Sequence, residues 1–322
     1  MSRRAITVSV IIPTYNRAHC VGEAIDSVLA QVPPANEVIV VDDGSTDNTV
    51  EVLAGYGDRI IILHQDNAGA AAARNTGIRH ATSEWVAFLD SDDLWYPGRM
   101  AVLHRDLADA DEDIVGHTGD MRFTGPKQDL RLFDLRGWQF SQGKAERVTN
   151  IILKGMTGLF SIATALRRVN VLEEGGYRES LRIYEDVALF YSLALRGPWL
   201  FTGDILAESR RLPDDTDPLS TIERNHPVEA ANGKVQFMSA LLDRDLSPEQ
   251  RILIMKQTSG ALLALAAAEA AENTGSHRRT AIASARQHPS ALNGWLKALP
   301  PLLLGRIGYQ ISLQRRKAFT RS

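Results

Sequence analysis

Short apolar runs alternate with segments of helical periodicity over the first ninety residues. Runs rich in β-branched side chains occupy residues 8–12, 38–41, 60–63 and 85–89. Such runs are typical of strands that are buried on both faces of a sheet. Between them, the spacing of apolar residues predicts helices at residues 18–31, 49–54 and 70–81. This alternation predicts a mostly parallel sheet with right-handed crossovers.

The pattern is looser after residue 97. Helices are predicted at residues 100–110 and 186–195, and residues 114–165 mix short strands with loops. Residues 211–225 contain two prolines and four acids and are typical of a loop. A helix over 251–272 is preceded by Ser247, Pro248 and Gln250, which form a helix-start signal.

We therefore expect two parts along the chain. Residues 1–220 would form an α/β domain with a Rossmann-like sheet and helices on both faces, and residues 221–322 a helical C-terminal region. Within the domain, residues 1–98 carry the regular alternation and residues 99–220 the looser pattern.

The composition is that of an ordinary globular protein. Of 322 residues, 44% are hydrophobic and 23% charged, which excludes a disordered chain, a collagen-like repeat and a disulfide-rich miniprotein. Cys20 is the single cysteine, so no disulfide can form within the chain, which suits a reducing compartment. We find no signal peptide and no uncharged run of about eighteen residues, and we expect a cytoplasmic protein without a membrane-spanning helix.

Charge is distributed unevenly along the chain. Nine of the 36 Lys and Arg residues follow Glu272, where no acid occurs, which leaves 27 basic against 39 acidic residues before that point. Residues 295–319 are rich in apolar side chains and their charged residues are all Arg or Lys, so this tail could lie on an anionic membrane surface. Alternatively, it is a helix that packs on the domain with its Arg heads in solvent. No signature of a nucleic-acid-binding fold is present.

Polar side chains follow the predicted strands at the ends where a parallel sheet binds ligands. These are Pro13, Thr14, Tyr15 and Arg17 after the first strand, Asp43 after the second, Arg74 in the helix after the third, and Asp90, Ser91 and Asp92 after the fourth. Asp47 could simply cap a helix, and Arg74 could be a solvated helix residue. The convergence of four strand ends nevertheless indicates a ligand site.

Asp90 and Asp92 give the most specific chemical signal. Two carboxylates two residues apart, where a strand breaks into a loop, can both face one point, and hard oxygens suit Mg²⁺ or Mn²⁺. The alternative is a polar turn, because Asp and Ser favour turns.

Several common site motifs are absent from the sequence. There is no G-x-G-x-x-G after the first strand, no P-loop, no zinc-type histidine spacing and no G-x-S-x-G elbow. These absences argue against a dinucleotide-binding dehydrogenase, a P-loop NTPase, a zinc enzyme and an α/β-hydrolase.

Five segments together resemble a known family. They are VSVIIPTYNR (8–17), VIVVDDGSTD (38–47), NAGAAAARNTG (67–77), FLDSDDLW (88–95) and GGYRESLRIYED (175–186). The chain resembles the inverting, metal-dependent nucleotide-sugar glycosyltransferases of family 2, which have the GT-A fold. The resemblance covers about residues 6–212 and says little of the remainder.

The resemblance implies a role for each matching residue. Residues 1–98 would be the nucleotide-sugar half and residues 99–220 the acceptor half, with a UDP-sugar as donor. Pro13, Thr14, Tyr15 and Asp43 would hold the base, and Arg17, Arg74 and Ser91 belong to the same nucleotide-binding set. Asp90 would lie near the ribose and the metal, and Asp92 would bind the Mn²⁺ or Mg²⁺ that bridges the diphosphate. Asp186 would be the general base, with Glu185 as the alternative.

The sequence departs from the family in one motif. Relatives that act processively carry a Gln/Arg-x-x-Arg-Trp motif after the base, whereas this chain has Ser209, Arg210 and Arg211 with no Trp. This argues against a processive, membrane-embedded synthase and leaves Arg210 or Arg211 as residues that could close over the diphosphate.

We therefore expect transfer of a sugar to a glycan or lipid-linked acceptor, in bacterial surface polysaccharide biosynthesis. The enzyme would be cytoplasmic, or peripheral on the cytoplasmic face of the inner membrane. A sugar nucleotidyltransferase is one alternative, although it would need a Gly-rich basic loop after the first strand. A nucleotide-sugar-binding protein without catalysis is the other.

Overall fold

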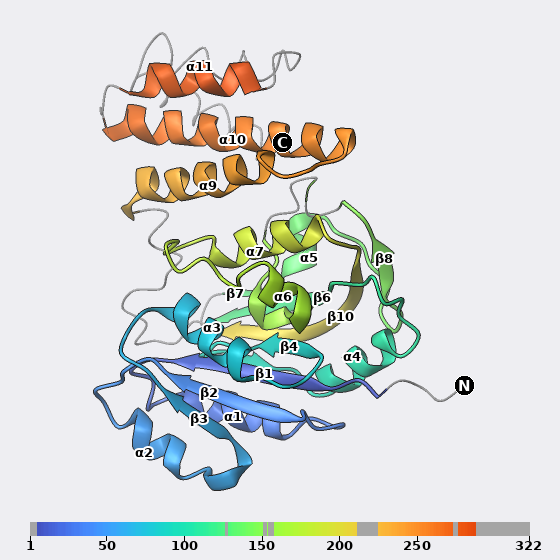
Figure 1. Ribbon diagram of the computed structural model, residues 1–322. Helices are drawn as coiled ribbons and strands as arrows, with labels where there is room; N and C mark the ends of the chain where they lie inside the picture. The colour runs from blue at the N-terminus through green and yellow to red at the C-terminus, as the bar shows by residue number, and fades with distance from the viewer. Residues whose placement is uncertain are drawn as a thin grey trace. The chain divides into compact units, whose positions relative to one another are not determined.

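The computed structural model describes residues 5–125, 128–150, 153, 158–210, 225–272 and 276–287 (Figure 1). The chain divides into two compact units. Unit 1 comprises Met1–Ile151, Met156–Ser180 and Glu185–Thr216, and unit 2 comprises Ile152–Gly155, Leu181–Tyr184 and Asp217–Ser322. The predicted loop at 211–225, Arg211 and the basic tail at 295–319 lie almost wholly outside the described residues. The boundary at residue 220 therefore stays a prediction.

Unit 1 is built on one ten-stranded sheet. The strand order is β3-β2-β1-β4-β9-β6-β10-β5, with β7 paired to β6 and β8 paired to β10. The strands are β1 (Val8–Thr14), β2 (Glu37–Asp42), β3 (Ile61–His64), β4 (Trp85–Phe88), β5 (Leu94–Trp95), β6 (Gly116–Gly125), β7 (Gln128–Arg131), β8 (Glu146–Val148), β9 (Thr164–Arg167) and β10 (Trp199–Arg210).

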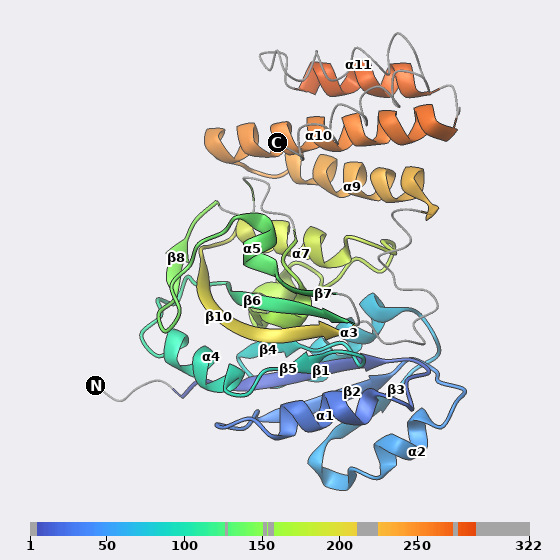
Figure 2. The same ribbon diagram turned by 180° about the vertical axis from the view of Figure 1, so that it is seen from behind.

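The first four strands form the predicted parallel part of the sheet. β3, β2, β1 and β4 pair in parallel, and every residue of β1 is buried. Helix α3 (Ala70–His80) lies in front of the sheet in Figure 1 and α1 (Val21–Leu29) in front of it in Figure 2, so helices cover both faces. The predicted α/β fold is confirmed for this part of the chain.

The other strands make the sheet mixed. β9 is antiparallel to both β4 and β6, and β5, β7 and β8 also pair antiparallel, while β6 and β10 are parallel to each other. Most of these strands come from residues 94–167, where the sequence pattern was loose. β6 is difficult to identify because His117 and Asp120 are buried in it. His117 pairs with Asp106 at 2.8 Å, and Asp120 pairs with Arg131 at 2.6 Å.

The predicted helices of unit 1 start within three residues of their predicted positions, and they include α2 (Thr49–Ala54), α4 (Arg99–Leu107) and α7 (Glu185–Ala194). Two short helices were not predicted, α5 (Leu132–Arg136) and α6 (Arg168–Glu173), and unit 1 also has the 3-10 turns η1 (Gly57–Arg59) and η2 (Ser161–Ala163). A glycine brings α3 against β1, because a Cβ on Gly77 would lie 2.5 Å from Cγ2 of Ile11. This close approach fixes the helix that carries Arg74.

Unit 2 contains three described helices, α9 (Pro227–Leu242), α10 (Pro248–Glu272) and α11 (His277–Gln287). The predicted start signal is confirmed, since the Ser247 amide donates to Gln250 Oε1 at 3.0 Å and the Gln250 amide donates to Ser247 Oγ at 3.2 Å. By length and composition α10 could cross a membrane, contrary to our expectation, but a buried helix of a soluble fold meets the same criteria. α10 contacts both α9 and α11.

Candidate functional site

The loops that follow β1 and β2 are locked together. Asn16 adopts a left-handed conformation with φ of 53°, and its Oδ1 accepts a hydrogen bond from the Thr46 amide at 2.8 Å. Asp47 accepts from the Ala18 amide at 3.1 Å and from the Thr49 amide at 3.0 Å, at the start of α2. Asp47 lies one residue before Asn48, the N-cap of α2, and its carboxylate both accepts from the first amide of the helix and connects the two loops.

The end of β1 presents one buried and one exposed polar group. Pro13 and Thr14 are buried, whereas 44% of Tyr15 is exposed. Thr14 Oγ1 is buried without a hydrogen-bond partner among the described residues. A buried hydroxyl without a partner costs about 1–3 kcal/mol, so a ligand that bonded to it would recover this cost.

Asp43 organises the loop that leads into α3. Its carboxylate accepts hydrogen bonds from Gln65 Nε2 at 2.7 Å and from the amides of Ala68 and Gly69 at 2.9 and 2.8 Å. The next residue, Gly44, has φ of 80°, and a Cβ there would lie 3.0 Å from the Asn67 nitrogen. In this structure the Asp43 carboxylate therefore holds the β3–α3 loop at the end of β2.

Three carboxylates, those of Asp90, Asp92 and Asp93, lie among four consecutive residues in the loop after β4. Asp92 lies 3.7 Å from Arg17, and the side chains of Asp90 and Asp92 are 37% and 25% exposed. Asp93 is buried and accepts from the Arg210 amide at 2.9 Å. Burial and the charges of Asp90 and Asp92 hold the pKa of Asp93 well above its usual range. Ser91, between them, is buried.

Arg74 connects this acidic loop to α7. Its guanidinium is 5% exposed, donates to Asp90 Oδ1 at 2.6 Å and to Glu185 Oε1 at 3.1 Å, and lies 5.3 Å from the Tyr177 ring centre. Burial alone would lower the pKa of Arg74, but the charges of Asp90 and Glu185 outweigh it and raise the pKa. Arg74 is thus a permanent buried cation between two carboxylates and is not a solvated helix residue.

Glu185 and Asp186 begin α7 and differ in environment. Glu185 is 12% exposed and paired with Arg74, whereas the pKa of Asp186 is raised to about 7 by burial and then by the charge of Glu185. The Val187 amide donates to Asp186 Oδ1 at 2.6 Å. Asp186 therefore titrates near neutral pH, as a catalytic base requires.

The acidic loop suits a divalent cation. Asp90 and Asp92 supply hard carboxylate oxygens that are partly exposed, and Mg²⁺ and Mn²⁺ are held by one or two carboxylates together with substrate phosphates. Among the described residues, no group of three or more His, Cys, Asp or Glu side chains forms a cage for a metal. The chemistry of these residues thus fits a cation whose shell a substrate completes.

The structure brings the predicted residues to one edge of the sheet. Thr14 pairs with Asp42 at the ends of β1 and β2, and the Leu89 amide donates to the Ile11 carbonyl beside them at 3.1 Å. Three contributors were not predicted from the sequence: Asn16, Asn75 and Tyr177. Their signal was present, because Asn75 follows Arg74 in one motif and Tyr177 follows two glycines in another.

A family model and curated relatives match the chain. The model described as "Glycosyl transferase family 2" matches residues 9–175. An uncharacterized glycosyltransferase of Rickettsia typhi, RT0329, is 31% identical over 220 residues, which are 63% of this chain and 63% of that protein. One of Rickettsia felis is 32% identical over 189 residues, which are 58% of this chain and 30% of that protein. The chain thus spans less than two thirds of the length of these relatives.

Solved structures share the fold. Residues 1–349 of Staphylococcus aureus TarS, crystallised with UDP-GlcNAc, give a TM-score of 0.68 at 17% identity and cover 95% of this chain and 92% of that chain. The mannosyltransferase PcManGT of Pyrobaculum calidifontis, in complex with GDP-Man and Mn²⁺, gives a TM-score of 0.54 at 20% identity, covering 94% and 88%. The fold is therefore of the GT-A type.

We expect Asp186→Asn to stabilise unit 1 at alkaline pH. A carboxyl whose pKa is raised by folding binds its proton more tightly in the folded state, so the free energy of unfolding falls as pH rises from about 4 to about 7. The neutral amide removes this cost, which predicts a melting temperature higher by about 2–4 °C at pH 8 and by less at pH 5. Differential scanning fluorimetry would measure it, with the exposed Asp111→Asn as control. An equal effect of Asp186→Asn at both pH values would contradict the prediction.

Proposed function

Because the chain belongs to glycosyl transferase family 2, we propose that it transfers a sugar from a nucleoside-diphosphate sugar to an acceptor hydroxyl. The observation that carries this proposal is the bridge made by Arg74. This residue joins Asp90, on the acidic loop, to Glu185, beside the candidate base Asp186. The bridge would join the cation-binding side of the proposed site to its proton-accepting side.

The acidic loop and the end of β1 form the donor side of the proposed site. Asp92, with Asp90, would hold Mn²⁺ or Mg²⁺, which when bound offsets the charge that the departing diphosphate gains. The buried hydroxyl of Thr14 and the exposed ring of Tyr15 would contact the nucleoside, with Pro13 and Asp43 shaping the pocket. A UDP-sugar is the proposed donor, which the UDP-GlcNAc complex of the TarS fold supports.

Besides Arg74, Arg17 and Arg210 lie against the acidic loop and would contact the diphosphate. Arg17 lies 3.7 Å from Asp92, and Arg210 Nε donates to the Asp92 carbonyl at 2.9 Å. Arg74 would position the donor indirectly, because its guanidinium is engaged by two carboxylates of unit 1, Asp90 and Glu185. Ser91 lies between the two metal-binding candidates and would set their spacing.

Asp186 is the proposed general base on the acceptor side. It would remove the proton from the acceptor hydroxyl while that oxygen attacks the anomeric carbon, and the bond from carbon to the diphosphate oxygen would break. The products are the glycoside and the nucleoside diphosphate. A single displacement without a carboxylate nucleophile inverts the anomeric centre. We favour Asp186 over Glu185 because Glu185 is engaged by Arg74 at 3.1 Å.

The proposed acceptor is a glycan or lipid-linked glycan of bacterial surface polysaccharide biosynthesis. The argument is compositional: residues 295–319 are rich in apolar side chains and their charged residues are all Lys or Arg, which suits an anionic lipid surface. The enzyme would then act in the cytoplasm, at the inner face of the membrane.

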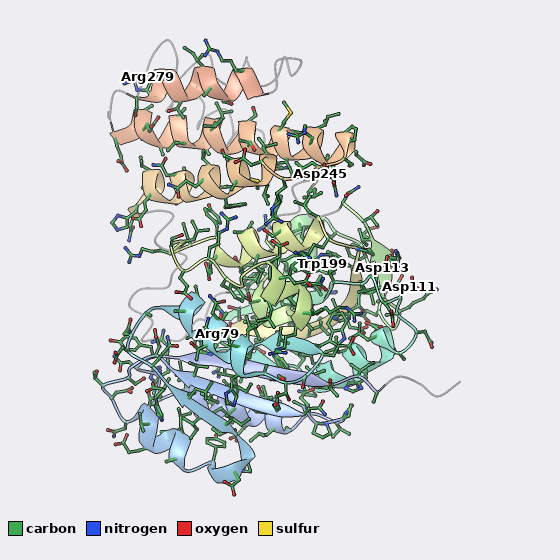
Figure 3. The ribbon with its side chains drawn as sticks, viewed as in Figure 1. Arg79, Asp111, Asp113, Trp199, Asp245 and Arg279 are labelled. Carbon is green, nitrogen blue, oxygen red and sulfur yellow. The ribbon has the colours of Figure 1, made fainter. Side chains whose placement is uncertain are left out.

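Asp92→Asn should weaken metal-dependent donor binding. Loss of a charged ligand predicts that the affinity for UDP in the presence of Mn²⁺ falls by roughly 10- to 100-fold. Isothermal titration calorimetry with and without Mn²⁺ would measure it. Asp113→Asn is the matched control, because Asp113 pairs with Arg147 and lies near the start of β6 and β10, beside Trp199 in Figure 3. An unchanged Mn²⁺ effect would remove Asp92 from the metal site.

Asp186→Asn should retain binding of UDP and lose transfer by about 10²- to 10⁴-fold. In the unmodified chain, kcat/KM should fall about tenfold per pH unit below about 7, where Asp186 gains its proton. Glu185→Gln removes a charge that raises the pKa of Asp186, so it should move this fall to lower pH while turnover persists. Turnover retained in Asp186→Asn and lost in Glu185→Gln would assign the base to Glu185.

Deletion of residues after 290 should abolish binding to anionic vesicles. The full chain is expected to co-sediment with vesicles rich in anionic lipid and to dissociate as salt increases, because the attraction is electrostatic. Vesicles of neutral lipid provide the control. Equal co-sedimentation of the full and shortened chains with both kinds of vesicle would exclude a membrane role for this tail.

A further inference from the structure

We propose that Asn75 is a positioning residue that fixes the acceptor-side segment 176–179 against α3, and so sets the geometry of sugar transfer. The inference rests on the proposed function and deepens it. Asn75 touches none of the groups proposed to react. It acts on the residues around them, through one helix that it shares with Arg74.

The Asn75 side chain makes three hydrogen bonds to one short segment. Its Nδ2 donates to the Tyr177 carbonyl at 2.8 Å and to Glu179 Oε1 at 2.9 Å, and its Oδ1 accepts from the Tyr177 amide at 2.8 Å. Asn75 is 5% exposed. A planar amide that both donates to and accepts from one residue's backbone fixes the orientation of that residue as well as its distance.

Gly176 leaves room for the Asn75 amide because it has no Cβ. Its φ of 78° lies in the left-handed region, and a Cβ added to it would collide with Oδ1 of Asn75. Only glycine therefore permits both the turn and the close approach. Two residues about a hundred positions apart in the chain are matched to each other.

Segment 176–179 places the Tyr177 ring against the Arg74 guanidinium. Tyr177 is 2% exposed, packs edge-to-face on Phe88 with ring centres 5.4 Å apart, and lies within 3.0 Å of Ser161 Oγ through its hydroxyl. Its ring centre is 5.3 Å from the Arg74 guanidinium. The Tyr177 ring thus packs against the Arg74 guanidinium, which donates to Glu185.

Arg74 and Asn75, which are consecutive in α3, therefore have different roles. Arg74 contacts Asp90 and Glu185, while Asn75 holds the segment that supports Arg74. If the segment shifted, Tyr177 would no longer hold the guanidinium, and Glu185 and Asp186 would move relative to the donor. Donor binding would change less than transfer, because segment 176–179 contacts Asn75, Phe88 and Ser161 directly and is linked to the acidic loop through the pair of Arg74 and Asp90.

The test compares transfer with donor binding in five variants of the full chain. Asn75→Ala should lower kcat by roughly 10- to 100-fold, since a displacement of about 1 Å at a reacting centre has effects of that size. Its Kd for UDP with Mn²⁺ should stay within about twofold, because the donor side is intact. Gly176→Ala should do the same from the other side of the contact.

Exchanging the donor and the acceptor of the hydrogen bond between Asn75 and Glu179 tests for rescue. Asn75→Asp still accepts from the Tyr177 amide but faces Glu179, so its kcat should fall as in Asn75→Ala. Adding Glu179→Gln provides a donor to the new carboxylate and should restore part of the lost kcat. Arg79→Ala is the control on the same helix, at an exposed residue labelled in Figure 3, and should transfer normally.

Two results would overturn this inference and leave the proposed function standing. One is a normal kcat in Asn75→Ala, and the other is a loss of UDP affinity and melting temperature in step with kcat and without rescue, which would indicate a merely structural residue. A wild-type chain that transfers no sugar from any nucleotide sugar with Mn²⁺ would instead overturn the proposed function, and this inference with it.

Discussion

The buried charge of Arg74 is the constraint on which the site depends. A guanidinium without a partner in a protein interior would be very costly, so it requires carboxylates close by. Asp90 and Glu185 supply them from opposite directions, one from the loop after β4 and one from the start of α7. Because Arg74 is fixed by both, the separation between the acidic loop and α7 is set by the reach of one planar group.

The same charge separates the roles of two adjacent carboxylates. Glu185 pairs with Arg74, and burial followed by the charge of Glu185 raises the pKa of Asp186. Adjacent carboxyl groups with different proton affinities are a common way to obtain a base that works near neutral pH. The arrangement needs no unusual residue, only burial and one arginine placed nearer to Glu185 than to Asp186.

Much of residues 1–98 could be predicted from the sequence, because the strands there are buried on both faces and appear as continuous apolar runs. Parallel pairing then requires their ends to meet, which is why Thr14, Asp43 and Asp90 share one edge. Residues 99–220 were harder to predict. β6 contains the buried polar residues His117 and Asp120, whose partners lie on other elements, so its pattern resembles that of a loop. The link between Asn75 and Tyr177 spans 102 positions, and no local periodicity reports such a contact.

The fit between Gly176 and Asn75 has a consequence for how the chain can evolve. Families of this architecture could in principle diversify by exchanging one half for that of a relative, as interchangeable modules. Here residues 67–77 and 175–186 meet through a glycine on one side and an amide on the other, and a side chain in place of the glycine would collide with the amide. Recombination within this lineage should therefore be productive only when both parents carry the same pair, so that the halves are inherited together.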